Sequence, residues 1–158
     1  MITTHAPATY RCPICLGVQG IVSPDTLIRP TDVVYQDELV TAFINSFFVG
    51  VNSGHVIVVP NEHYESIHTL PSAYGHRVFD VAQKIALAMK DAYQCDGITT
   101  RQNNEPAGDQ HPFHYHFHIF PRYNDDGFNA VQLSEKRLAG AEERAEWAER
   151  LRGELGDN

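Results

Sequence analysis

Three histidines alternate with large apolar residues in the segment from His114 to Phe120. In a β-strand, successive side chains point to opposite faces, so His114, His116 and His118 share one face at intervals of about 6–7 Å. Near neutral pH an imidazole can act as a nucleophile, a base, an acid or a metal ligand. The segment therefore predicts a strand with one reactive or metal-binding face. Its other face is expected to enter the core through Tyr115, Phe117 and Ile119.

A second group of reactive side chains is the Cys12-Pro13-Ile14-Cys15 motif near the N-terminus. In a cytosolic setting, two cysteines at this spacing indicate metal binding or redox chemistry before a structural disulfide. A thioredoxin-like site should lie between a strand and a helix, whereas a loop containing Gly, Pro and Ser follows this motif. The context favours a zinc site, which needs two further ligands. Cys95 is expected to be a small buried apolar residue.

Five β-rich runs and two helical segments are available to position these groups. The strands are expected at Val33–Gln36, Leu39–Ile44, His55–Val59, Ile98–Arg101 and the histidine segment, which Pro121 closes. Apolar residues at helical spacing predict one long helix from Pro71 to Tyr93 and a second from Ser134 to Leu155. Residues 16–32, 47–54 and 102–112 read as loops. The pattern predicts an α+β fold with a mostly antiparallel five-stranded sheet.

The composition limits the kind of partner. The chain has 158 residues, of which 42% are hydrophobic and 20% charged, and this fits a single domain spanning residues 1–158. A formal net charge of −8 argues against a nucleic-acid polymer, although a few local donors can hold a single nucleotide. No secretory signal and no bilayer-spanning apolar run is present. We therefore expect a cytoplasmic protein that does not enter a membrane.

Three blocks of sequence occur together in a fixed order. The first runs from Gly54-His55 through an apolar stretch to Pro60 and His63, and the second contains Asn103 and Ala107-Gly108-Asp109-Gln110. The third is the histidine segment with Pro121-Arg122. Together they resemble the histidine triad (HIT) superfamily of nucleotide hydrolases and transferases. The resemblance implies a HIT-like domain with its core at about residues 10–130, a C-terminal helical extension at 134–155 and, as is common in the family, a homodimer.

The resemblance also implies roles for individual residues. His116 is implied to be the nucleophile that takes up a nucleoside monophosphate, since a neutral imidazole can attack phosphorus when its other ring N–H is held. His118 and Asn103 are implied to contact the α-phosphate. Gln110 is implied to bridge the nucleophile and a phosphate oxygen, and Asn45 to lie at the ribose.

The chain departs from the family pattern beside the glutamine. The position after Gln110 usually carries Ser or Thr, whose hydroxyl helps the leaving group, and here it is His111. We hypothesise that His111 acts as the leaving-group acid; the alternative is a surface-loop histidine. Asp109 stands where Gly is frequent, and it would repel a polyphosphate if it pointed inward. His55, on the adjacent strand, is implied to support the histidine cluster.

Some members of the family also carry Cys-x-x-Cys before the first strand. In those members zinc is held by both cysteines, by the histidine after the proline and by the first triad histidine. The resemblance therefore implies that Cys12, Cys15, His63 and His114 hold Zn²⁺ here. Two thiolates and two imidazoles make a closed, tetrahedral structural site. Such a site would remove His114 from acid–base chemistry.

The function that the resemblance favours is hydrolysis of a nucleotide at its α-phosphate. Candidate substrates are dinucleoside polyphosphates and nucleoside phosphoramidates, with adenine or another purine as the base. His118 argues against the uridylyltransferase branch, where that position is typically Gln. A nucleotidyl transferase or phosphorylase and a nucleotide-binding module with little activity are the alternatives. A catalytic metal bound by His114, His116 and His118 is a further reading, but it leaves the upstream blocks without a role.

Overall fold

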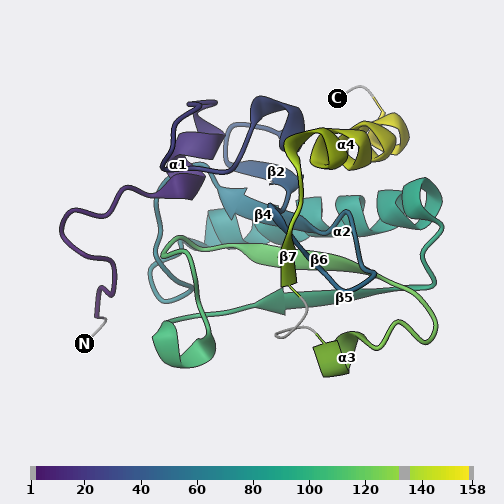
Figure 1. The fold of residues 1–158 in the computed structure, drawn as a ribbon. Helices are drawn as coiled ribbons and strands as arrows, with labels where there is room; N and C mark the ends of the chain where they lie inside the picture. Colours follow the sequence, from purple (N-terminus) through teal and green to yellow (C-terminus); the bar gives the residue numbers. More distant parts are fainter. Residues whose placement is uncertain (1–2, 132–135, 157–158) are drawn as a thin grey trace.

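The computed structural model describes residues 3–131 and 136–156 of the chain. Its main sheet has five strands, and every neighbouring pair is antiparallel (Figure 1). In spatial order the strands are β1 (Val33–Gln36), β2 (Val40–Ile44), β4 (Val56–Pro60), β6 (Phe117–Arg122) and β5 (Gly97–Gln102). The predicted α+β class and mostly antiparallel sheet are thus confirmed.

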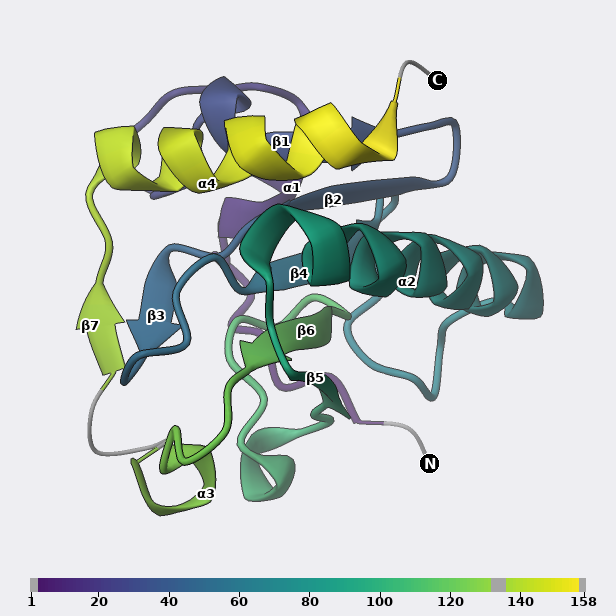
Figure 2. The same cartoon turned by 90° about the vertical axis from the view of Figure 1, so that its right-hand side faces the viewer.

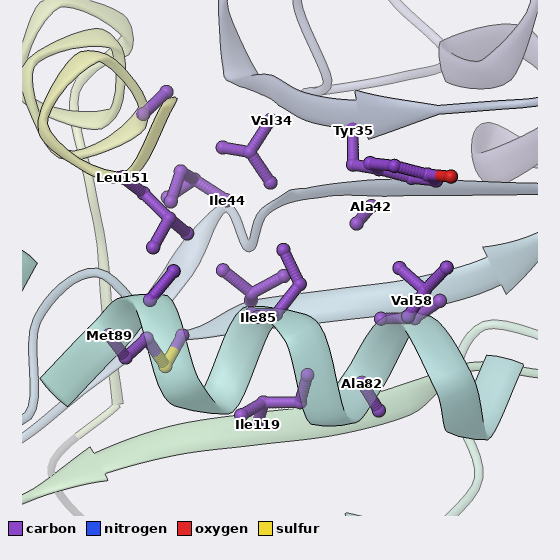
Figure 3. Close-up of a cluster of buried hydrophobic side chains, with 14 of the residues drawn as sticks. Val34, Tyr35, Ala42, Ile44, Val58, Ala82, Ile85, Met89, Ile119 and Leu151 are labelled. Carbon is purple, nitrogen blue, oxygen red and sulfur yellow. The ribbon is translucent and has the colours of Figure 1, made fainter. Parts of the chain in front are cut away.

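Two helices cover one face of this sheet. The long helix α2 (Ser72–Tyr93) packs on β2, β4 and β6, and α4 (Ala141–Leu155) packs on α2, β1 and β2 (Figure 2). The core between them is apolar and includes Ile85, Met89 and Leu151 (Figure 3). Within the described parts of the chain, neither these helices nor any other is long and apolar enough to cross a membrane.

The opposite face of the sheet is covered by the N-terminal segment. The short helix α1 (Pro13–Val18) contributes Ile14 to a second apolar cluster with Ile28, Phe43 and Ile57. Side chains alternate along β4, where Val56 and Val58 enter the helix-side core and Ile57 faces the second cluster. Since His118 pairs with Ile57 across β4 and β6, the histidines share the α1 side of the sheet.

A second, two-stranded sheet lies at one end of the molecule, where the sequence predicted other structures. The strand β3 (Phe47–Val49) falls in the expected loop, and β7 (Lys136–Leu138) falls in the expected helix from Ser134 to Leu155. Helix α4 itself begins at Ala141, so only the later part of that prediction holds. Residues 134 and 135 lie outside the described residues. The local apolar stripe gives no sign that β7 pairs with a strand about ninety positions earlier, Leu138 facing Phe47.

A buried ion pair joins α4 to the residue that precedes β1. The Nε of Arg144 donates to Oδ1 of Asp32 at 3.1 Å, and both side chains are almost fully buried. The remaining donors of Arg144 bind the carbonyl oxygens of Ala139 at 2.6 Å and Leu27 at 2.8 Å. The second oxygen of Asp32 accepts from the Arg29 backbone N–H at 2.8 Å. Hydrogen bonds on both partners offset the cost of burying the two charges.

Replacing Arg144 by Met should lower the free energy of unfolding by about 3 kcal/mol, because the Asp32 carboxylate is left buried without its cation. The matched control is Arg152→Ala on the same helix, where the guanidinium donates to Thr31 and Val33 carbonyls at the surface. The control should cost less than about 1 kcal/mol. Urea denaturation measures both losses, and equal losses would contradict the assignment.

Candidate active site and metal centre

A cavity of about 380 Å³ opens on the α1 side of the sheet. One part of its wall is apolar and includes Ile14, Ile28, Phe43 and Ile57 from the second cluster. Its polar lining residues include Asn45, His111, His116, His118 and Lys136. The cavity thus combines an apolar surface suited to a flat ring with nitrogen donors and acceptors.

The histidine segment is only partly a strand. The prediction placed a strand from His114 to Phe120, closed by Pro121, whereas β6 begins at Phe117 and continues through Pro121 to Arg122. Only Phe117 to Ile119 of β6 pair with β4. Pro121 lies beyond this pairing, so its missing N–H leaves no hydrogen bond to β4 unmade. Upstream, the Tyr115 N–H donates to the Tyr64 carbonyl at 2.6 Å instead of joining the sheet. The predicted alternation survives, since Tyr115, Phe117 and Ile119 pack into the helix-side core.

His116 is held in a defined tautomer. Its Nδ1 lies 2.7 Å from the backbone carbonyl of His114, and since a carbonyl only accepts, Nδ1 carries the proton. The side chain is 2% exposed, and burial lowers the pKa of His116 to about 4. The ring is therefore neutral at pH 7 and carries a lone pair on Nε2. His116 lines the cavity, as a nucleophile must.

His118 and His55 form a pair behind His116. Nε2 of His55 lies 2.9 Å from Nδ1 of His118, and the His118 and His116 rings are 4.7 Å apart between centroids. His55 is buried, its ring centroid 4.0 Å from that of Phe120. Burial lowers the pKa of His55 to about 3 and that of His118 well below its ordinary value. In this neutral pair one imidazole donates and the other accepts.

Two other predicted residues lie on the cavity wall. Asn45 lines the cavity, and its Nδ2 donates to the Phe47 carbonyl at 2.9 Å. His111 also lines the cavity and is exposed, which leaves its ring accessible to a ligand. Asp109 is exposed and does not line the cavity, so the structure gives no sign of the repulsion considered above.

Asn103 and Gln110 are not brought to the cavity wall. The side-chain amide of Asn103 donates to the Gly108 carbonyl, within the same loop. Gln110 is buried, accepts from the Glu105 N–H at 2.7 Å and donates to the Glu65 carbonyl. In this structure both residues hold the loop that precedes the histidines.

The four predicted metal ligands come together in one cluster. The ligand atoms of Cys12, Cys15, His63 and His114 all lie within 4.8 Å of one another. Nδ1 of His114 is 3.4 Å from the Cys12 sulfur and 3.5 Å from the Cys15 sulfur, and Nδ1 of His63 is 3.4 Å from the Cys15 sulfur. Ligands at 2.3 and 2.1 Å from a tetrahedral zinc ion are separated by about 3.6 Å. The cluster therefore has the dimensions and the donor set of a metal site.

Local structure prepares these ligands. Cys12 is the N-cap of α1 with Pro13 at the first helical position, and the Cys12 sulfur accepts from the Cys15 N–H at 3.4 Å. The pKa of the Cys12 thiol lies below its ordinary value chiefly because a hydrogen bond from the Cys15 side chain favours the Cys12 thiolate. Nε2 of His114 lies 3.0 Å from the Pro60 carbonyl, which fixes the tautomer that leaves Nδ1 for a metal.

Sequence reasoning missed the lysine of the cavity wall. Lys136 reaches the wall from β7, a strand that the sequence placed in a helix. The Lys136 ammonium lies 4.5 Å from the centroid of the Phe47 ring. Nothing in the local spacing around Lys136 marks it, because it reaches the cavity through the pairing of β7 with β3.

The fold and the site define a class of protein. It has an α+β fold, a buried histidine cluster on one side of an antiparallel sheet, and a Cys₂His₂ cluster next to it. Comparison with known proteins gives the family. The chain belongs to the HIT family, because the HIT domain model matches residues 27–125.

Individual relatives agree with this assignment. Protein hit of Bacillus subtilis is 39% identical over 103 residues, covering 65% of this chain and 70% of that protein. The crystal structure of a zinc-bound histidine triad family protein from Mycobacterium smegmatis has a TM-score of 0.72 and 28% identity, covering 91% of this chain and 92% of that one. An adenosine 5′-monophosphoramidase of Saccharomyces cerevisiae is 29% identical over 72 residues, covering 46% of this chain and 43% of that protein.

Proposed function

We propose that the protein is a nucleotide hydrolase that acts at the α-phosphate through a covalent nucleotidyl intermediate on His116. The observation that carries this proposal is the hydrogen bond from His116 Nδ1 to the His114 carbonyl. It presents a neutral, unprotonated Nε2 in a cavity large enough for part of a nucleotide. Kinship with a yeast adenosine 5′-monophosphoramidase supports the reaction class.

The reaction has two steps. Nε2 of His116 attacks the α-phosphorus, a P–N bond forms and the bond to the leaving group breaks. The leaving group takes a proton from His111, which lines the cavity and is exposed. Water then attacks the phosphorus and passes a proton to His111. The P–N bond breaks, its electron pair returns to His116, and a mononucleotide is released.

The His55–His118 pair suits the phosphate oxygens. An oxygen of the phosphate needs a donor, so the productive tautomer is the one in which His55 Nε2–H donates to His118 Nδ1. His118 then presents an N–H on Nε2. Asn103 and Gln110 remain proposed phosphate ligands. To bind the phosphate, each side chain must break its hydrogen bond to a backbone carbonyl of the protein.

The rest of the cavity suits a nucleoside. The apolar wall of Ile28, Phe43 and Ile57 offers a surface for a base, and adenine or another purine fits the proposal. Asn45 also lines the cavity, and we propose that its side chain contacts the ribose hydroxyls.

We further propose that the Cys₂His₂ cluster binds one structural Zn²⁺. The zinc-bound relative from Mycobacterium smegmatis and the spacing of the four ligand atoms support this. The bound ion would supply a crosslink between the N-terminal arm and the histidine segment and takes no part in the reaction. His114 is one of the four proposed ligands, and its backbone carbonyl holds the His116 ring in the tautomer with the proton on Nδ1.

The variant His116→Ala should lower turnover at least about 10³-fold on both adenosine phosphoramidate and a dinucleoside polyphosphate, because no covalent intermediate can form. Release of mononucleotide, followed by chromatography, measures the loss. His76→Ala, at an exposed position on α2, is the control and should keep full activity. Equal mononucleotide release by wild type and His116→Ala would exclude His116 as the nucleophile. Nucleotide binding without turnover by the wild type would point instead to a binding module.

The role of His111 depends on how much help the leaving group needs. His111→Ala should slow cleavage of adenosine phosphoramidate about 10²-fold, because the departing amine must be protonated. It should change the first-turnover release of p-nitrophenol from the p-nitrophenyl ester of AMP by less than about threefold, because that leaving group departs without a proton. First-turnover rates of leaving-group release from the two substrates test this, and an unchanged rate on the phosphoramidate rules out the acid role.

Metal analysis of the purified protein should find about one zinc per chain in the wild type and less than half of that in Cys12→Ser, because a thiolate ligand is lost. Cys95→Ser is the matched control, since Cys95 is buried away from the cluster and should leave the zinc content unchanged. Wild-type protein with less than half an equivalent of zinc, or Cys12→Ser with a full equivalent, would show that zinc is not held there.

A further inference from the structure

Fixed charge is scarce on the wall of the cavity. Among the described residues that line it, Lys136 is the one basic residue and Asp25 the one acidic residue. The Asp25 carboxylate already pairs with Arg11 at 2.7 Å. The permanent positive charge on this wall therefore comes from Lys136.

The position of Lys136 is set by the pairing of β7 with β3 (Figure 2). Lys136 faces Val49, and its ammonium lies 4.5 Å from the centroid of the Phe47 ring, which also lines the cavity. Because side chains alternate along β7, Arg137 points to the other face, where it contacts Phe48. The cation–π contact with Phe47 holds the ammonium at the cavity while leaving its N–H donors available to a ligand.

The segment that carries Lys136 is firmly tied to the domain. The Ala139 N–H donates to the Ser46 carbonyl at 2.9 Å, and the Ala139 carbonyl accepts from Arg144 at 2.6 Å. Arg144 also donates to the carbonyl of Leu27, another residue of the cavity wall. Strand β7 and helix α4 lie beyond residues 27–125, which the HIT domain model matches. The C-terminal segment therefore contributes to a cavity that is also lined by residues of the matched HIT domain and of the segment before it.

We propose that Lys136 binds the phosphate of the nucleotide and makes the cavity select phosphorylated over unphosphorylated nucleosides. This inference rests on the proposed nucleotide site. A phosphate that enters this cavity brings further negative charge to a chain with a net charge of −8. A nearby ammonium supplies the missing charge through charge-assisted hydrogen bonds. Burial is the main cause of the lowered pKa values of His55 and His118; the Arg101 charge contributes to both, and the Lys136 ammonium makes a smaller contribution.

Isothermal titration with AMP and with adenosine tests the proposal on the full-length protein. The two ligands differ only in the phosphate, and GMP with guanosine is run alongside so that base preference does not affect the comparison. Lys136→Gln should raise the Kd for the monophosphate about tenfold and change the Kd for the nucleoside less than twofold. Lys136→Arg, which keeps the charge, should recover most of the affinity.

Arg137→Gln is the matched control, because it removes the same charge from the next residue of β7, whose guanidinium binds Glu143 away from the cavity. It should leave the affinity for the monophosphate unchanged. If Lys136→Gln weakens nucleoside and monophosphate equally, Lys136 only packs on Phe47 and the inference is wrong. If the wild type prefers the monophosphate and Lys136→Gln keeps that preference, the inference fails while the proposed function stands. If the wild type binds neither ligand, the nucleotide site itself is refuted.

Discussion

The arrangement of the site depends on His114, because both ring nitrogens and the backbone carbonyl of this residue contact different parts of the chain. Nδ1 faces the thiols of Cys12 and Cys15, Nε2 lies 3.0 Å from the Pro60 carbonyl, and the backbone carbonyl lies 2.7 Å from Nδ1 of His116. A carbonyl can only accept, so both ring tautomers are fixed. The orientation of the proposed nucleophile thus follows from the residue that joins the N-terminal arm to the end of β4.

The sheet separates an apolar core on its helix side from buried histidines on its other side. On the helix side, aliphatic residues such as Ile85 and Leu151 form the main core. On the other side, His55 and His116 are buried as polar groups, and burial keeps both rings in the neutral form. Neutral rings can attack or relay a proton, but they provide no charge for a phosphate. This division explains why a lysine from a distant strand matters for the cavity.

Much of the architecture could be predicted from the sequence, because local side-chain periods report burial. The period of two in the histidine segment predicted which residues would enter the core, and the helical period predicted α2 closely. The metal cluster was predicted as well, although by resemblance to known proteins and not by spacing, since Cys12, Cys15, His63 and His114 are far apart in the sequence.

By itself, therefore, the sequence determined the fold class and the face that carries the histidines, and resemblance to a family added the four residues of the Cys₂His₂ cluster. Only the tertiary structure decided how the loops and the C-terminal segment complete the site. In the folded protein the side-chain amides of Asn103 and Gln110 donate to backbone carbonyls. The pairing of β7 with β3 brings Lys136 to the cavity. The physical reason is that hydrogen bonds between residues distant in sequence leave no trace in local periodicity, whereas burial of one side of an element does.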